Sequence, residues 1–271
     1  MFLLMEKVVS NAGVVGEKEF WNEIFETGHS VYEVIRIING TALFCEDHFE
    51  RLLVSSQLGN FNFRMEFSEF QTHISELISQ NQKLNGNVKF LFSETEHQNY
   101  WVFSFIPHNY PTSEAYLHGV NTDLLFIERE NPNAKLIQNS VRFEADQMIA
   151  ERNLYEILLV DRHHKITEGS RSNVFFVKDE VFYTAHDTQV LPGITRQKII
   201  VCLKKLGFEV IEVAVAASEI SQFEAAFLTG TSPKVLPIRS IGNQKFKTQL
   251  PSVQKLMNMY DQMIEEYLKR T

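Results

Sequence analysis

Residues 30–59 read SVYEVIRIINGTALFCEDHFERLLVSSQLG, a strand-like run followed by a tight turn and a helical run. The first part is rich in β-branched residues, and Asn39-Gly40 is a two-residue sequence that favours a β-hairpin. Further along, Phe49 and Leu52 recur at helical spacing, with acids at the start of the run and a glycine at its end. The stretch therefore predicts two paired strands followed by a helix.

Mixed strands and helices continue through the rest of the chain. Helical spacing returns in FSEFQTHISELISQN, and the runs NVKFLFSE and NYWVFSFI predict a hairpin around residues 95–98. The segment PHNYPTSEAYLHG has two prolines and no period, which marks a linker. Beyond it, strands and helices alternate irregularly up to a long helix that begins near Pro251. With so many hairpins, an α+β fold is favoured over a doubly wound parallel sheet.

The length and composition of the chain bound its architecture. A chain of 271 residues is long enough for two domains, and a hydrophobic content of 44% excludes extensive disorder. We predict a smaller N-terminal α+β domain over residues 1–110 and a larger C-terminal α+β domain over residues 121–271. A linker over residues 111–120 joins them.

The charge and the cysteines favour a particular class of protein. A net charge of −8 with scattered Lys and Arg residues argues against binding to nucleic acid. The opening run MFLLM is broken by Glu6 and Lys7, so it is too short for a signal peptide or a membrane span. Cys45 and Cys202 lie in apolar contexts, where two reduced buried thiols are favoured over a disulfide. The sequence therefore predicts a cytoplasmic protein with no membrane partner.

Two polar segments interrupt apolar runs where a ligand could bind. Gly193, Ile194 and Thr195 stand where a helix begins, and the N–H groups at a helix start suit an anion such as phosphate. Thr229, Gly230 and Thr231 end a buried strand, so two hydroxyls flank a residue that allows close backbone approach. An N-cap threonine and a strand-end turn are the ordinary explanations, and they stay open at this point.

Two charged residues extend the pattern. Arg51 in HFERL carries a planar fork of donors that suits phosphate, although a surface arginine is the alternative. Glu168 in TEGSRSNVFF precedes an apolar, strand-like run, where a carboxylate needs a cationic partner. The histidines lack regular ligand spacing, so no metal site is predicted. Together the segments indicate a ligand that carries both a phosphate and a basic nitrogen.

The order of these motifs resembles the class IV aminotransferases. Five segments follow one another in the order and spacing of that family: GHSVYEVIRIINGTALFCEDHFERL, NAKLIQNS, YEILLVDRHHKITEGSRSNVFFV, VLPGITRQKII and AAFLTGTSPKVLPI. The family depends on pyridoxal 5'-phosphate (PLP) and includes branched-chain and D-amino acid aminotransferases and aminodeoxychorismate lyase. The resemblance implies the two-domain fold-type IV architecture of these enzymes, with a cofactor-binding C-terminal domain, and a homodimer.

The resemblance also implies roles for individual residues. Lys135 in NAKLIQNS matches the lysine that binds PLP covalently and then moves protons. Glu168 matches the acid that meets the pyridine nitrogen and keeps the ring protonated. The remaining matches surround the cofactor. They are the phosphate cup of Arg51, Ile194, Thr195 and Thr231, the adjoining Gly193 and Gly230, and Ser170 and Asn173 close to the cofactor.

Residues expected to bind the substrate distinguish the branches of this family. Tyr32 and Glu33 match the aminotransferases, whereas the lyases usually carry threonine near these positions. Glu94 stands where D-amino acid aminotransferases place an arginine, and its charge would repel a substrate carboxylate. Lys89 falls near a basic position that binds substrate carboxylates, with an outward-facing strand lysine as the alternative.

The resemblance therefore predicts an aminotransferase that moves an amino group between an apolar, branched-chain-like amino acid and a 2-oxo acid such as 2-oxoglutarate. One alternative is aminodeoxychorismate lyase, which releases pyruvate. Another is a non-catalytic dimeric binding protein of the same fold, although the set of Lys135, Glu168 and Arg51 argues against it. The identity and stereochemistry of the amino acid stay open.

Overall fold

The computed structural model describes residues 6–16, 30–94, 99–137 and 139–270. The chain forms two compact units. The first consists of Met1–Asn109, Ala134–Ile137 and Glu266–Thr271, and the second of Tyr110–Asn133 and Gln138–Glu265. The opening run and the turn expected at residues 95–98 lie outside the described residues.

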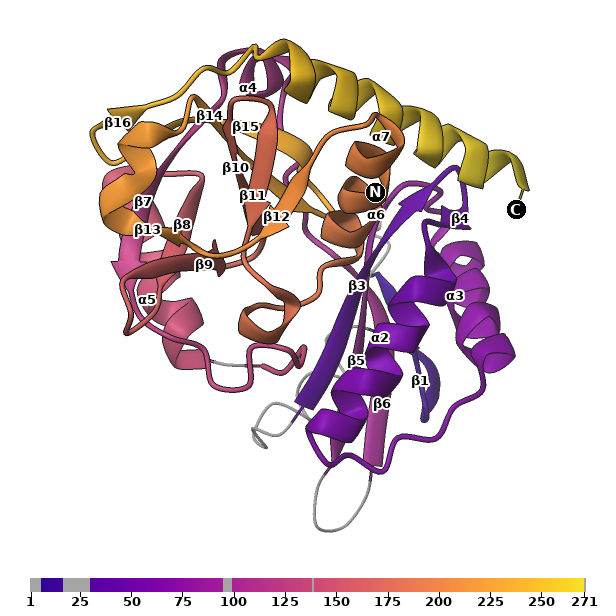
Figure 1. The fold of residues 1–271 in the computed structure, drawn as a ribbon. Coiled ribbons are helices and arrows are strands. Elements are labelled where there is room, and N and C mark those ends of the chain that lie inside the picture. Colours follow the sequence, from indigo (N-terminus) through magenta and orange to yellow (C-terminus); the bar gives the residue numbers. More distant parts are fainter. Residues whose placement is uncertain (1–5, 17–29, 95–98, 138, 271) are drawn as a thin grey trace. The chain divides into compact units, whose positions relative to one another are not determined.

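The described part of the first unit is a six-stranded sheet with helices on one face (Figure 1). The strand order is β2-β1-β6-β5-β3-β4, and all neighbours are antiparallel. Its elements are β1 (Lys7–Ser10), β2 (Gly13–Gly16), β3 (Ser30–Ile38), β4 (Thr41–Ala42), α2 (Cys45–Leu58), α3 (Phe67–Asn81), β5 (Gly86–Glu94) and β6 (Asn99–Ile106). Apolar residues of both helices pack on the sheet and form the core of this unit.

Local sequence explains why β3 is followed by a turn and a helix. Asn39 and Gly40 both have positive φ angles, 51° and 83°, as a two-residue hairpin turn requires. The helix α2 then ends at Leu58, with Gly59 as its C-terminal cap. The predicted turn and helix are confirmed. The hairpin of β1 and β2 was not predicted, because strands of four residues show too little periodicity.

The described part of the second unit contains a ten-stranded sheet (Figure 1). The order is β12-β11-β10-β14-β15-β7-β8-β9-β13, with β16 paired to β15. The strands are β7 (Val120–Phe126), β8 (Glu156–Val160), β9 (Lys165–Gly169), β10 (Asn173–Lys178), β11 (Val181–Thr184), β12 (Val210–Glu212), β13 (Val215–Ala216), β14 (Ala225–Gly230), β15 (Lys234–Ile241) and β16 (Gln244–Lys245). The helices are α4 (Ser113–His118), α5 (Asn139–Arg152), α6 (Ile194–Lys205) and α7 (Pro251–Arg270), with short 3-10 turns η1 (Asp187–Gln189) and η2 (Ala217–Gln222). The last residues of α7, from Glu266 onward, belong to the first unit.

Parallel and antiparallel pairs are mixed in this second sheet. Only the pairs β7–β8, β7–β15 and β11–β12 are parallel among the described pairings. The remaining neighbours are antiparallel, several of them joined by short turns. The predicted α+β class is therefore confirmed.

The boundary between the units differs in detail from the expected linker. Residues 111–120 hold the short helix α4, which begins where Thr112 Oγ1 accepts a hydrogen bond from Ala115 N at 3.2 Å. Residues 134–137 belong to the first unit because they run beside β3. There Tyr32 N donates to Lys135 O at 3.1 Å and Ile137 N donates to Ser30 O at 3.2 Å. Periodicity within one segment carries no information about such long-range pairing.

Three further features bear on the class of protein. None of the helices in the described ranges combines the length and the apolar character that a membrane span requires. Within the same ranges, no three His, Cys, Asp or Glu side chains are grouped so that they could hold a metal ion. Cys45 and Cys202 are both buried free thiols.

Candidate active site

Lys135 is held in place by its main chain. Its carbonyl accepts the hydrogen bond from Tyr32 N, and its own N–H donates to Ser55 Oγ of α2 at 3.1 Å. The ammonium nitrogen lies 4.7 Å from the centroid of the Tyr32 ring. Both the strand β3 and the helix α2 therefore fix the backbone from which this lysine extends.

A second lysine contacts the same aromatic ring. Lys89 Nζ lies 5.4 Å from the centroid of the Tyr32 ring. In the β3–β5 register Tyr32 is opposite Leu91 and Val34 is opposite Lys89, so all four side chains lie on one face of the sheet. The structure thus brings Tyr32 and Lys89, the two predicted substrate residues, together with Lys135, the predicted covalent lysine.

Arg51 belongs to a buried polar cluster on the opposite face. Glu33, which has no exposed surface, accepts hydrogen bonds from Arg51 Nε at 2.8 Å and from Arg51 Nη2 at 2.7 Å. The same carboxylate accepts a hydrogen bond from His48 Nδ1 at 2.8 Å. His48 and Arg51 are three residues apart on α2, and that spacing was a signal in the sequence for a shared partner.

The charges of this cluster are well defined. Burial would raise the pKa of Glu33, but the Arg51 guanidinium and the hydrogen bonds from Arg51 and His48 outweigh it and hold that pKa well below its ordinary value. Burial lowers the pKa of His48, although the hydrogen bond to Glu33 and the charge of Glu33 oppose that shift. The cluster is therefore an ion pair of Glu33 and Arg51 to which the His48 imidazole also donates.

Glu168 lies within β9 and is only 3% exposed. Its Oε1 accepts a hydrogen bond from Arg129 Nη1 at 2.8 Å, and its Oε2 accepts one from Leu191 N at 3.1 Å. Among the described residues, the cation that Glu168 meets is thus Arg129. This arginine was not predicted from the sequence, since 39 residues separate the two partners.

The turn after β9 is folded around another carboxylate, that of Glu156. Its Oε1 accepts from Ser170 Oγ at 2.6 Å and from Ile157 N at 2.9 Å. Its Oε2 accepts from Ser172 Oγ at 2.9 Å and from Arg171 N at 3.1 Å. The Ser170 hydroxyl, which was expected near the cofactor, is therefore a donor to Glu156. The signal for Glu156 was a lone acid at the start of a fully buried strand.

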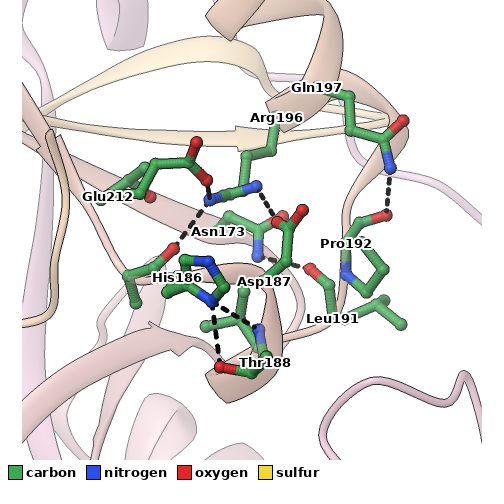
Figure 2. Close-up of polar contacts among 12 residues, drawn as sticks. Asn173, His186, Asp187, Thr188, Leu191, Pro192, Arg196, Gln197 and Glu212 are labelled. Atoms are coloured by element: carbon green, nitrogen blue, oxygen red, sulfur yellow. Dashed lines mark hydrogen bonds and ion pairs between the residues drawn. The ribbon is translucent and has the colours of Figure 1, made fainter. Parts of the chain in front are cut away.

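The start of α6 has the features of an anion site. Gly193 is its N-cap and offers no side-chain acceptor, and the first turn contains no acidic residue. A Cβ on Gly193 would overlap Oδ1 of Asn173, whose Nδ2 donates to Leu191 O at 2.9 Å (Figure 2). Ile194 and Thr195 are both buried. The N–H groups of this first turn have no acceptors within the helix, so they suit a bound anion.

A buried hydroxyl lies on the strand next to this helix start. Thr229 of β14 is opposite Asn173 of β10 and is 1% exposed. Its Oγ1 has no hydrogen-bond partner within the described ranges, which is costly for a buried polar atom unless a ligand supplies one. Gly230 is the last residue of β14, and Thr231 follows it directly. Thr229 was noticed in the sequence only as one hydroxyl of this strand end.

Glu94 does not lie with the residues that face Tyr32. Neighbouring residues of a strand point to opposite faces, so Glu94 points away from the face of Lys89 and Leu91. Its Oε2 accepts a hydrogen bond from Asn62 N at 3.2 Å. The expected repulsion between Glu94 and a substrate carboxylate therefore loses its support, and with it the argument against a D-amino acid.

The fold is shared with known enzymes. A branched-chain amino acid aminotransferase from Escherichia coli matches with a TM-score of 0.82 at 21% identity, covering 96% of this chain and 94% of that one. Another branched-chain amino acid aminotransferase, from T.th. and solved with pyridoxamine 5'-phosphate, matches with a TM-score of 0.86 at 22% identity, covering 98% of this chain and 96% of that one. A putative 4-amino-4-deoxychorismate lyase from Legionella pneumophila matches with a TM-score of 0.78 at 20% identity, covering 87% of this chain and 91% of that one. At these identities the likeness establishes the fold.

Sequence comparison extends the likeness to the family. A D-alanine aminotransferase from Bacillus licheniformis is 28% identical over 243 residues, 84% of each chain. A probable branched-chain-amino-acid aminotransferase from Thermotoga maritima is 28% identical over 227 residues, 82% of this chain and 81% of the relative. The family model for amino-transferase class IV matches residues 30–241. The predicted family, fold and cofactor are confirmed, the non-catalytic alternative is set aside, and the chain belongs to the PLP-dependent class IV aminotransferases.

Proposed function

We propose that this enzyme moves an amino group between an apolar, branched-chain-like amino acid and a 2-oxo acid such as 2-oxoglutarate. The observation that carries the proposal is the composition of the sheet face around Tyr32. An apolar cluster of Val8, Leu91 and Val102 packs there with Tyr32 and its neighbours. The ammonium groups of Lys89 and Lys135 both approach the Tyr32 ring. The partly buried members of this cluster include Tyr32, Tyr100 and Ile137, and such apolar side chains beside a cation suit a substrate that combines an apolar side chain with a carboxylate.

The residues of each unit fit the cofactor chemically. The uncapped start of α6 and the unpartnered Thr229 hydroxyl offer donors for a phosphate. The buried carboxylate of Glu168 offers an acceptor for a ring N–H, and Arg129 supplies a positive charge that favours its ionised form. Lys135 offers a primary amine on a fixed backbone. When bound, PLP supplies an electron-poor ring that stabilises the negative charge developing at the α-carbon of the substrate.

In the proposed mechanism each residue has a defined task. Lys135 would hold the cofactor through its amine until the amine of the substrate displaces it. The freed Lys135 amine would then move the proton from the α-carbon of the substrate to the cofactor, and the second half-reaction would reverse that transfer. Glu168 accepts the hydrogen bond of the pyridine N–H and so keeps the proton on that nitrogen. The N–H groups of Ile194 and Thr195, next to Gly193, bind the phosphate.

The remaining assigned residues complete the proposal. Thr229 and Thr231 donate hydroxyls to the phosphate beside Gly230, and Arg51 adds its charge. Asn173 positions the start of α6 next to the cofactor. Ser170 donates to Glu156 and so fixes the turn that follows Glu168. Lys89 binds the substrate carboxylate. The homodimer and the cytoplasmic location stay predictions from the sequence.

A substrate screen tests this function. Purified holoenzyme is mixed with single L- and D-amino acids, and loss of the cofactor's visible absorbance band is followed, with 2-oxoglutarate added to complete the cycle. We expect leucine, isoleucine and valine to react faster than alanine, aspartate or glutamine. Fastest reaction with a small or polar amino acid would refute the apolar assignment. Pyruvate release from aminodeoxychorismate without an amino acceptor would show the lyase instead.

Arg51→Ala is expected to weaken PLP affinity by about 1.5–3 kcal/mol, on the order of ten- to a hundredfold, through loss of a charged hydrogen-bond donor to the phosphate. The change also strands the buried Glu33 carboxylate, which costs about 3–5 kcal/mol of unfolding free energy. Titration of the apoprotein with PLP measures the first effect, and denaturant unfolding measures the second.

The double variant Arg51→Ala/Glu33→Gln separates the two effects. Because it removes both charges, it is expected to recover most of the stability but none of the affinity. Recovery of PLP affinity in the double variant would show that Arg51 serves only its partner Glu33, and that the phosphate is bound elsewhere.

A further inference from the structure

Arg196 is a buried cation in the first turn of α6. It is 1% exposed, and its guanidinium reaches acceptors in separate segments of the second unit (Figure 2). Its Nη2 donates to Ala185 O and to Glu212 Oε2, both at 2.8 Å, and its Nη1 donates to the carboxylate of Asp187. Ala185 and Asp187 lie between β11 and α6, whereas Glu212 ends β12.

The helix itself gains nothing from this arginine. A cation in the first turn opposes the helix dipole, which is positive at that end, and the turn carries no acid to offset it. Burial of the guanidinium adds a desolvation cost that its two carboxylate partners must offset. The position of Arg196 therefore calls for an explanation outside the helix, in what it binds.

Ala185 and Asp187 belong to the segment of residues 185–193, here named the spacer segment. Near its far end, Leu191 N donates to Glu168 Oε2 at 3.1 Å, and Leu191 O accepts from Asn173 Nδ2. Thus one residue of the spacer segment is bonded both to the buried carboxylate and to the side chain against which the helix start packs.

The middle of the spacer segment is also tied down. Asn133 Nδ2 donates to Val190 O at 3.2 Å and to the main-chain oxygen of Asp187. The segment is therefore held by Arg196 at one end, by Asn133 in the middle and by Glu168 and Asn173 at the other end. Its conformation sets how far the Glu168 carboxylate lies from the start of α6.

We infer that Arg196 is a positioning residue for cofactor binding. By holding Ala185 and Asp187 it fixes the spacer segment, and the spacer segment fixes the separation between Glu168 and the α6 start. The inference rests on the proposed function, in which these two groups bind the pyridine nitrogen and the phosphate of one rigid molecule. A wrong separation between Glu168 and the α6 start then weakens the binding of a ligand that contacts both groups. It does not weaken the binding of a ligand that contacts only the α6 start.

Two matched variants test this role. Asp187→Ala and Glu212→Ala each remove one carboxylate partner of Arg196 and leave the other in place, and both carboxylates are partly exposed, 51% and 35%. Only Asp187 belongs to the spacer segment. Dissociation constants of the apoprotein are measured for PLP and, separately, for inorganic phosphate, with thermal unfolding to verify that each variant is folded.

The expected change in PLP affinity is opposite in sign to the change that would follow from removing a negative charge near an anionic ligand. Asp187→Ala should weaken PLP binding by about tenfold, in the range for a misplaced site group, while phosphate binding changes by less than about twofold. Glu212→Ala should weaken the binding of neither PLP nor phosphate. If only the loss of a negative charge mattered, both variants would bind PLP and phosphate more tightly than the parent.

Three outcomes would overturn the inference. They are equal effects of the two variants on PLP, tighter PLP binding in Asp187→Ala, and equal losses for PLP and phosphate in Asp187→Ala. Thr229→Val tests the underlying assignment independently. If that variant binds phosphate and PLP as the parent does, the Thr229 hydroxyl does not contact the phosphate and the proposed phosphate site fails, whatever Asp187→Ala shows.

Discussion

Lys135→Ala is expected to lower turnover by about four orders of magnitude, the upper range for a positioned proton-transfer group. The variant loses both the amine that binds the cofactor and the base that removes the α-carbon proton. Initial rates at saturating PLP measure the loss. Borohydride reduction of the parent holoenzyme, followed by peptide mapping, should place the cofactor label on Lys135.

Lys83→Ala is a matched control for this prediction. Lys83 Nζ also lies 4.7 Å from an aromatic centroid, that of Phe105, and it pairs with Glu6 at 2.9 Å, so its loss removes an equivalent ring contact and one ion pair. Turnover of Lys83→Ala should stay within about twofold of the parent, since Lys83 has no assigned role in the reaction and its ion pair is solvent-accessible. A borohydride label on any other lysine, or substantial turnover in Lys135→Ala, would contradict the assignment.

Glu168→Gln is expected to lower turnover by roughly two orders of magnitude, as for loss of one electrostatic contact to a transition state. The amide keeps the shape of the side chain but removes the charge that favours a protonated ring nitrogen. Cofactor should still bind, because the phosphate contacts are unchanged. Steady-state rates and the absorbance spectrum of the bound cofactor measure the two effects.

Glu224→Gln controls for the loss of an ion pair in the same unit. Glu224 Oε2 accepts from Lys247 Nζ at 3.0 Å, and neither residue is assigned to the cofactor. Its turnover should match that of the parent. Near-normal turnover of Glu168→Gln would show that Glu168 serves only as the structural partner of Arg129.

Local sequence predicted the longer elements well. The helix α3, at Phe67–Asn81, occupies the predicted run, and the Asn39-Gly40 turn follows directly from its two residues. Both depend on neighbours in sequence, which is the information that periodicity and turn chemistry contain. The two-residue strand β13 and the short helix α4 are too short for such a signal.

Residues of the candidate site could be predicted only where they lie within a motif of the family. Lys135 and Glu168 were assigned by resemblance, but their partners were not, because Ser55 and Arg129 lie 80 and 39 residues away from them in sequence. The pairing of Arg51 with Glu33 likewise depends on α2 packing across β3. Such contacts follow from tertiary packing, to which no local pattern points.

The turn around Glu156 bears on how this enzyme can be altered. Its two serines and one carboxylate share a single set of hydrogen bonds, so substitutions at these three positions are not independent of one another. Changing one of them leaves polar atoms unsatisfied, and apolar replacement of all three would still leave the N–H groups of Ile157 and Arg171 without their acceptor. A directed-evolution library that varies one position at a time would therefore find this turn intolerant, and only combined changes that keep an acceptor for these two N–H groups would reach new sequences there.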